Sequence, residues 1–74
     1  MNAPQIVEAV LFASDAPLSP DEIARADDQL DEDQVEEALQ ALQAEYDDEQ
    51  RAFQLVEVAG GYQILTRPEY APYL

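Results

Sequence analysis

The stretch that decides the fold is Ala52-Phe-Gln-Leu-Val-Glu-Val-Ala-Gly-Gly-Tyr-Gln-Ile-Leu-Thr66. Two runs rich in β-branched and aromatic residues flank a glycine pair, and glycine readily adopts the positive φ angles of a two-residue hairpin turn. The stretch therefore predicts a β-hairpin in which Gly60 and Gly61 form the loop. In that register Val58 faces Gln63 across the two strands.

The side chains of this hairpin divide between two faces, because successive strand residues point in opposite directions. One face carries Phe53, Leu55, Ala59, Tyr62 and Ile64, interrupted by Glu57. The other carries Val56, Val58 and Leu65, with Gln54 and Gln63 among them. Since both faces hold apolar residues, we expect helices of this chain to cover one face and a partner to cover the other. A β-bulge that shifts the register halfway along the hairpin is the alternative.

Three helical patterns precede the hairpin. The segment from Pro4 to Ser14 has apolar residues at three- and four-residue spacing, with Phe12 outside the apolar arc. Phe12 is expected either to pack under the following loop or to contact a partner. A short second helix begins after Ser19, which caps it, with Pro20 at the first helical position and Glu22 completing a capping box.

The third helix is the longest. Asp31 and Gln34 are spaced as a second capping box, and the helix is expected to end near Asp47-Asp48-Glu49. Its apolar residues form a narrow stripe that is expected to face the core: Val35, Ala38, Leu39, Leu42 and Tyr46. After the hairpin, Thr66 and Glu69 are spaced as a further capping box, and Tyr70, Tyr73 and Leu74 have no evident place to be buried.

The order of these elements predicts an α+β fold of the winged helix-turn-helix class, with three helices followed by a β-hairpin wing. With 74 residues, positions 1–74 are expected to form a single domain. No apolar run approaches the length of a membrane span, and the first residues lack the basic start of a signal peptide. We therefore expect a soluble, cytoplasmic protein.

Charge is the most unusual property of the chain. It has 17 acidic residues against three arginines and no lysine, for a net charge of -14. Affinity for phosphate backbones and anionic membranes depends on clustered lysine and arginine, so we expect this domain to bind neither nucleic acid nor membrane. The same excess of acid predicts that salt stabilises the fold by screening self-repulsion, as in a salt-rich cytoplasm.

Residues with catalytic or metal-binding potential do not form a recognisable motif. The chain has no cysteine and no histidine, which excludes disulfides and zinc sites of the common kinds. The acidic run Asp27–Asp33 departs from a calcium loop because its sixth position is Glu32 rather than glycine. Capping accounts for Ser19, which has no base to activate it. We expect no enzymatic activity and no cofactor.

Two segments of the chain, one near its start and one in the hairpin region, resemble a known family. Ile6-Val-Glu-Ala-Val-Leu-Phe-Ala-Ser14 followed by Pro17-Leu-Ser, and then Leu55-Val-Glu-Val-Ala-Gly-Gly-Tyr-Gln-Ile-Leu-Thr-Arg-Pro-Glu-Tyr70, closely resemble the N-terminal part of bacterial segregation and condensation protein B. The wing leading into Thr-Arg-Pro-Glu-Tyr is the more specific segment. The acidic connection from Asp27 to Asp33 departs most from the family pattern.

The resemblance implies a non-enzymatic role in chromosome condensation and segregation. It implies two tandem winged-helix domains, with dimerisation largely through the N-terminal one. It also implies association with two partners: a kleisin subunit, which is segregation and condensation protein A, and an SMC ATPase. In that reading this chain is the N-terminal domain of a longer protein, cytoplasmic and associated with the nucleoid through the SMC complex. A homodimer is the assembly that such a fragment is expected to retain.

The residues expected at a protein interface are aromatic or β-branched side chains without an obvious core position. These residues are Phe12, Val56, Val58, Tyr62, Tyr70 and Tyr73. The alternative function is a winged-helix DNA-binding transcription regulator, which would need a basic surface. The sequence leaves open whether the hairpin or the first helix dominates the dimer contact.

Overall fold

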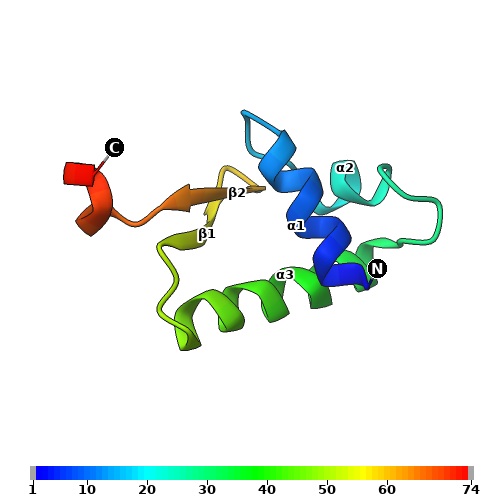
Figure 1. The fold of residues 1–74 in the computed structure, drawn as a ribbon. Helices are drawn as coiled ribbons and strands as arrows, with labels where there is room; N and C mark the ends of the chain where they lie inside the picture. The colour runs from blue at the N-terminus through cyan, green and yellow to red at the C-terminus, as the bar shows by residue number, and fades with distance from the viewer. Residues whose placement is uncertain (1, 74) are drawn as a thin grey trace.

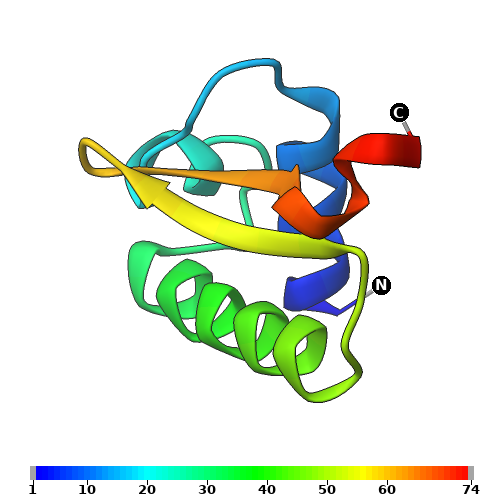
Figure 2. The same ribbon diagram turned by 90° about the vertical axis from the view of Figure 1, so that its left-hand side faces the viewer.

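The computed structural model describes residues 2–73 and confirms the predicted winged helix-turn-helix fold (Figure 1). The elements follow one another as α1 (Ala3–Ala13), α2 (Pro20–Ala24), α3 (Glu32–Asp48), β1 (Phe53–Val58), β2 (Gly61–Thr66) and the 3-10 helix η1 (Pro68–Tyr73). In Figure 2 the hairpin of β1 and β2 crosses in front of α1, with α3 below it. The predicted exposure of Leu74 lies outside the described residues.

The helix starts follow the capping rules. Ser19 accepts a hydrogen bond from the backbone of Glu22 and Asp31 accepts one from Gln34, and each capping box is closed by the reciprocal side-chain bond. These two boxes confirm the predicted starts of α2 and α3, because the boxes satisfy amide groups that no helical carbonyl can reach. A third box, formed by Asn2 and Gln5, begins α1 and was not predicted.

One hydrophobic core lies between the three helices and the inner face of the hairpin. All five residues of the predicted stripe on α3 are buried. Within residues 2–73 the buried apolar side chains are Val7, Leu11, Ile23, Val35, Ala38, Leu39, Leu42, Tyr46 and Leu55. Five of these residues come from α3 and two from α1, while α2 contributes Ile23 and β1 contributes Leu55.

The register of the hairpin differs from the prediction. Val58 pairs with Gly61 rather than with Gln63, so the turn consists of Ala59 and Gly60. Both turn residues have positive φ, 50° at Ala59 and 81° at Gly60, as a type I′ turn requires. The pairing moves by two residues, an even number, and therefore the predicted division of side chains between the two faces holds.

Gly61 is excluded from the turn by its packing. A Cβ atom at this position would lie 2.9 Å from Cβ of Pro17, so only glycine fits beneath the segment that precedes α2. The next residue of that segment, Leu18, pairs with Tyr62 through N–H···O bonds of 3.0 and 2.6 Å. Close approach of the segment Pro17-Leu18 thus explains why the turn begins one residue earlier than predicted.

The C-terminal segment also differs from the prediction. Thr66 is the last residue of β2 and pairs with Phe53, and η1 begins only after Arg67. Thr66 is therefore part of the sheet, so the predicted capping box with Glu69 does not start a helix there. Pro72 lies inside η1, which tolerates it because a short 3-10 helix needs few backbone hydrogen bonds.

Candidate functional site

The outer face of the hairpin carries an exposed apolar strip. Val58 is 47% exposed and Leu65 is 43% exposed, while Val56 is half-buried. Because Val56 pairs with Gln63, it lies diagonally opposite Leu65 on the same face. The strip of Val56, Val58 and Leu65 therefore runs obliquely across both strands. The alternation of side chains along β2 is the sequence signal that could have added Leu65 to the predicted interface residues.

β1 also offers a backbone edge. In the two-stranded sheet β1 pairs with β2, and the short bridge from Leu18 lies on the β2 side. Within residues 2–73 no strand pairs with the other side of β1. An edge of this kind presents N–H and C=O groups to a further strand.

Phe12 packs in part against the hairpin, and its predicted role at an interface stays a prediction. Its ring packs edge-to-face on Phe53 of β1, with ring centroids 5.3 Å apart and an interplanar angle of 89°. The side chain of Phe12 is still 53% exposed. The intramolecular contact therefore covers only part of the Phe12 ring and leaves the rest exposed. Phe53 was not among the predicted interface residues.

Tyr62 is separated from Val56 and Val58. It lies on the inner face of the hairpin, half-buried against the core, and helps to line a groove along α3. The predicted patch that combined Tyr62 with the two valines is therefore corrected, since the sheet places them on opposite faces. Burial, and then the carboxylates of Glu57 and Glu36, raise the pKa of the Tyr62 hydroxyl.

Tyr70 and Tyr73 lie together on η1, with ring centroids 6.4 Å apart. Tyr73 is 82% exposed, whereas Tyr70 is half-buried and lines a hollow with Asp47 and Arg67. The predicted interface residues thus occupy separate places on the molecule, and among them the hairpin face brings together only Val56 and Val58.

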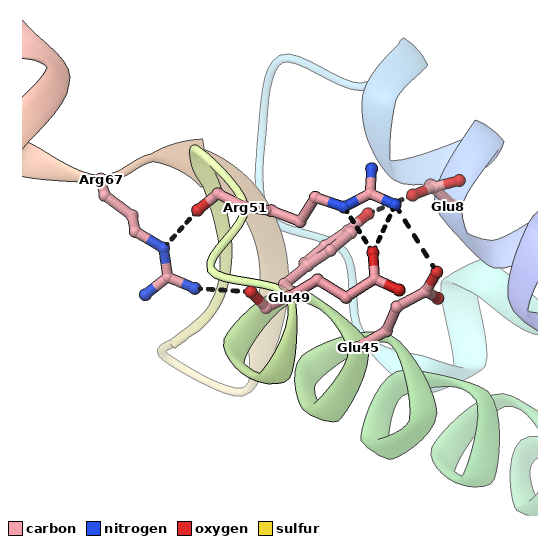
Figure 3. A network of polar contacts seen from close by, with 6 residues as sticks. Glu8, Glu45, Glu49, Arg51 and Arg67 are labelled. Atoms are coloured by element: carbon pink, nitrogen blue, oxygen red, sulfur yellow. Dashed lines mark hydrogen bonds and ion pairs between the residues drawn. The ribbon is translucent and has the colours of Figure 1, made fainter.

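Arg67 fastens the end of β2 to the end of α3 (Figure 3). Its Nε donates to the carbonyl of Arg51 at 2.7 Å, and Nη2 donates to the carbonyl of Tyr46 at 3.2 Å and to Asp47 at 2.9 Å. The last carbonyls of a helix lack helical partners and carry partial negative charge, so a guanidinium is favourable there. Arg67 therefore helps to fix the position of the wing against α3.

Arg51 and Tyr46 extend this network toward α1. Arg51 forms ion pairs with Glu49 at 2.7 Å and with Glu45 at 3.9 Å, as Figure 3 shows. The hydrogen bond and charge of Glu49 raise the pKa of the Arg51 guanidinium. The Tyr46 hydroxyl donates to Glu8 of α1, and burial together with this bond raises the pKa of Tyr46.

The groups that the fold brings together are suited to docking. Within residues 2–73 no three side chains of histidine, cysteine, aspartate or glutamate converge as metal ligands would. Over the same residues no helix is long and apolar enough to span a membrane. The exposed strip and the open edge of β1 are features that a protein partner can cover.

Comparison with known proteins gives consistent matches. A family model described as segregation and condensation complex subunit ScpB matches residues 5–74. Segregation and condensation protein B of Syntrophotalea carbinolica is 44% identical over 93% of this chain, and that of Geobacillus thermodenitrificans is 44% identical over 97%. The chain spans about a third of the length of these curated relatives, 34% in each case.

Solved structures agree with the sequence matches. A crystal structure of the dimer of ScpB N-terminal domain complexed with ScpA peptide superposes with a TM-score of 0.83 at 39% identity, covering 96% of this chain and 88% of that one. ScpB from Mycobacterium tuberculosis superposes with a TM-score of 0.85 at 27% identity, covering 96% of this chain and 44% of that one.

Proposed function

The chain belongs to the segregation and condensation complex subunit ScpB family, and from this premise we propose that it is a dimerising protein-interaction module of a chromosome segregation complex. The observation that carries the proposal is the similarity to a dimeric N-terminal domain that holds a ScpA peptide. The match over residues 5–74 includes the hairpin and η1, so it covers the surfaces described above.

In this proposal residues 1–74 form one winged-helix domain, the N-terminal domain of a longer tandem winged-helix protein. The 88% coverage of an N-terminal domain, against about a third of the full-length relatives, supports this assignment. The partners are a second copy, a kleisin subunit and, through the kleisin, an SMC ATPase. The role is non-enzymatic, in the cytoplasm and at the nucleoid.

The surface proposed for the second copy is the outer face of the hairpin. Val58 and Leu65 are nearly half exposed there, and burial of exposed apolar area is the main driving force of protein association. The carboxylates along α3 argue against the DNA-binding alternative, because they repel phosphates, whereas affinity for a phosphate backbone comes mainly from lysine and arginine. Phe12, Tyr70 and Tyr73 are proposed as flanking contacts.

Light scattering on the 74-residue chain tests this proposal directly. The wild type is expected to have the mass of a dimer, and Val56→Glu is expected to give a folded monomer because it places a charge within the apolar strip. Gln29→Glu is the matched control, since it adds the same charge in an exposed turn and should leave the dimer intact.

Phe12→Glu tests whether the aromatic pair also contributes to the contact. Circular dichroism on each variant separates loss of association from loss of folding. A monomeric wild type would refute dimerisation of this domain, and a Val56→Glu dimer of unchanged mass would show that the hairpin face is not the interface.

A further inference from the structure

The groove between α3 and the wing has its own chemistry, distinct from that of the apolar strip. It is lined by Glu36, Leu39, Gln40, Gln43 and Tyr62 and has a volume of about 230 Å³. This volume is below the usual range of about 300–1,000 Å³ for small-molecule sites, so the groove suits a single side chain of a larger partner.

The walls of the groove are acidic or amide-bearing, whereas its floor is apolar. Leu39 is 3% exposed and the Tyr62 ring is half-buried, and these two residues provide the floor. Glu57 is the direct cross-strand partner of Tyr62, so its side chain lies on the same face of the hairpin. Carboxylates from α3 and β1 therefore flank one aromatic ring.

All three arginine side chains of residues 2–73 are engaged outside the groove. Lysine is absent, and the three arginines form ion pairs outside the groove: Arg25 with Asp21, Arg51 with Glu45 and Glu49, and Arg67 with Asp47. Among residues 2–73 the carboxylates of Glu36 and Glu57 consequently have no ion-pair partner. A cation from another molecule would meet their charge and the negative face of the Tyr62 ring together.

We propose that this groove receives an arginine or lysine side chain from an extended segment of a protein partner. The charge of the groove rejects phosphate, which is the ligand that a winged helix meets at the corresponding face on DNA. The tyrosine ring offers a cation–π contact and the amides of Gln40 and Gln43 offer hydrogen bonds. This inference rests on the proposed role as a protein-interaction module and assigns a second surface to it.

The blocked peptide Ac-Gly-Arg-Gly-NH2 serves as the probe, followed by NMR on the 74-residue chain with labelled tyrosine rings. We expect saturable shifts of the Tyr62 ring with this peptide and none with the uncharged analogue that carries citrulline in place of arginine. Glu36→Gln and Glu57→Gln should each weaken binding about fivefold, the effect of losing one partly screened ion pair.

Glu37→Gln is the matched control, since it removes the same charge from the next residue of α3, outside the groove. Equal weakening by this control, or shifts spread over every acidic segment, would show diffuse attraction to an acidic protein and overturn the proposal. Absence of any saturable shift would overturn it as well. Light scattering on the same samples reports the dimer separately, so failure of the groove and failure of the proposed function are distinguishable.

Discussion

At the scale of single residues, Gly61 shows how one missing side chain sets the position of the wing. Its backbone lies against Pro17 and Leu18, where an added Cβ would be 2.9 Å from Cβ of Pro17 and 3.2 Å from the nitrogen of Leu18. Leu18 is also bridged to Tyr62, the residue after Gly61, and this pairing holds the chain before α2 against β2.

Gly61→Ala is expected to destabilise the fold by about 1–3 kcal/mol, the usual cost of overpacking, because the backbone on both sides must shift. Urea unfolding followed by circular dichroism measures the change. Gly60→Asn is the control, because Gly60 has no neighbouring atom within 4 Å and asparagine tolerates its φ of 81°. Similar losses in both variants would place the sensitivity in the turn rather than in the contact with Pro17.

The Tyr46 hydroxyl provides a second prediction at this scale, for alkaline pH. The folded-state pKa of Tyr46 is raised above the ordinary value of 10.0 by burial and by its bond to Glu8. A raised pKa means that the contribution to stability is complete below about pH 10 and is lost as the pH rises toward the folded pKa. At pH 8 Tyr46→Phe removes the hydrogen bond to Glu8 and should lower the free energy of unfolding by about 1 kcal/mol.

The same variant should lose less stability than the wild type between pH 10 and pH 11.5, since it has no buried hydroxyl to ionise. Urea unfolding at pH 8, 10 and 11.5 measures the difference. Tyr73→Phe, which removes an exposed hydroxyl, is the control for the loss of one tyrosine. Parallel decline of Tyr46→Phe and wild type would contradict the role assigned to this hydroxyl.

At the scale of elements, α3 ends in a Schellman motif built on an unusual residue. The N–H of Arg51 donates to the carbonyl of Tyr46 at 2.9 Å, and the N–H of Gln50 donates to that of Asp47 at 3.3 Å. Gln50 has a φ of 52°, a conformation in which glycine is far more common. The acidic run Asp47–Glu49 correctly predicted where α3 ends, but no glycine marks the left-handed residue that follows it.

Gln50→Gly should stabilise the chain by about 0.5–1 kcal/mol, because relief of the left-handed strain exceeds the added entropy of the unfolded chain. Gln50→Ala keeps the strained backbone and should change stability little, which makes it the matched control. Thermal and urea unfolding of the three proteins measure the order. A loss of stability in Gln50→Gly would indicate that the glutamine side chain makes a contribution of its own.

Sequence reasoning succeeded for elements with local signals and failed where tertiary packing decided. The capping boxes of Ser19 and Asp31 and the stripe on α3 are local, and the structure confirms them. The turn was placed one residue late because the contact of Gly61 with Pro17 joins segments far apart in the chain. The groove at Tyr62 was also missed, since it forms only when the wing packs against α3.

The exposed strip lies between these two cases. The alternation of side chains along each strand predicted that Val56, Val58 and Leu65 share the outer face of the hairpin. Leu65 was nevertheless not counted among the predicted interface residues. The same alternation placed Tyr62 on the inner face of the hairpin, which the structure confirms. Spacing along a strand therefore determines which side chains share a face, whereas exposure of that face depends on the packing of the helices.

At the scale of the whole molecule, positive charge gathers at one end. Arg51 and Arg67 both lie at the C-terminal end of α3 and pair with carboxylates there, while Arg25 pairs with Asp21 on α2. The remaining acidic residues are largely uncompensated at a net charge of -14. Most of these carboxylates are exposed, so their mutual repulsion acts through solvent and responds to salt.

The melting temperature is therefore expected to rise between about 0.01 M and 1 M KCl, over which the Debye length falls from about 30 Å to about 3 Å. A gain of about 1 kcal/mol would raise it by about 4–8 °C in a domain of this size. Removing three exposed carboxylates with Asp28→Asn, Asp33→Asn and Glu37→Gln should raise the melting temperature at low salt and reduce its dependence on KCl.

A flat or falling melting temperature in the wild type would mean that repulsion among these carboxylates does not limit stability. If KCl raised the melting temperature of the triple variant as much as that of the wild type, the cause would be salting-out of apolar surface, which does not depend on charge.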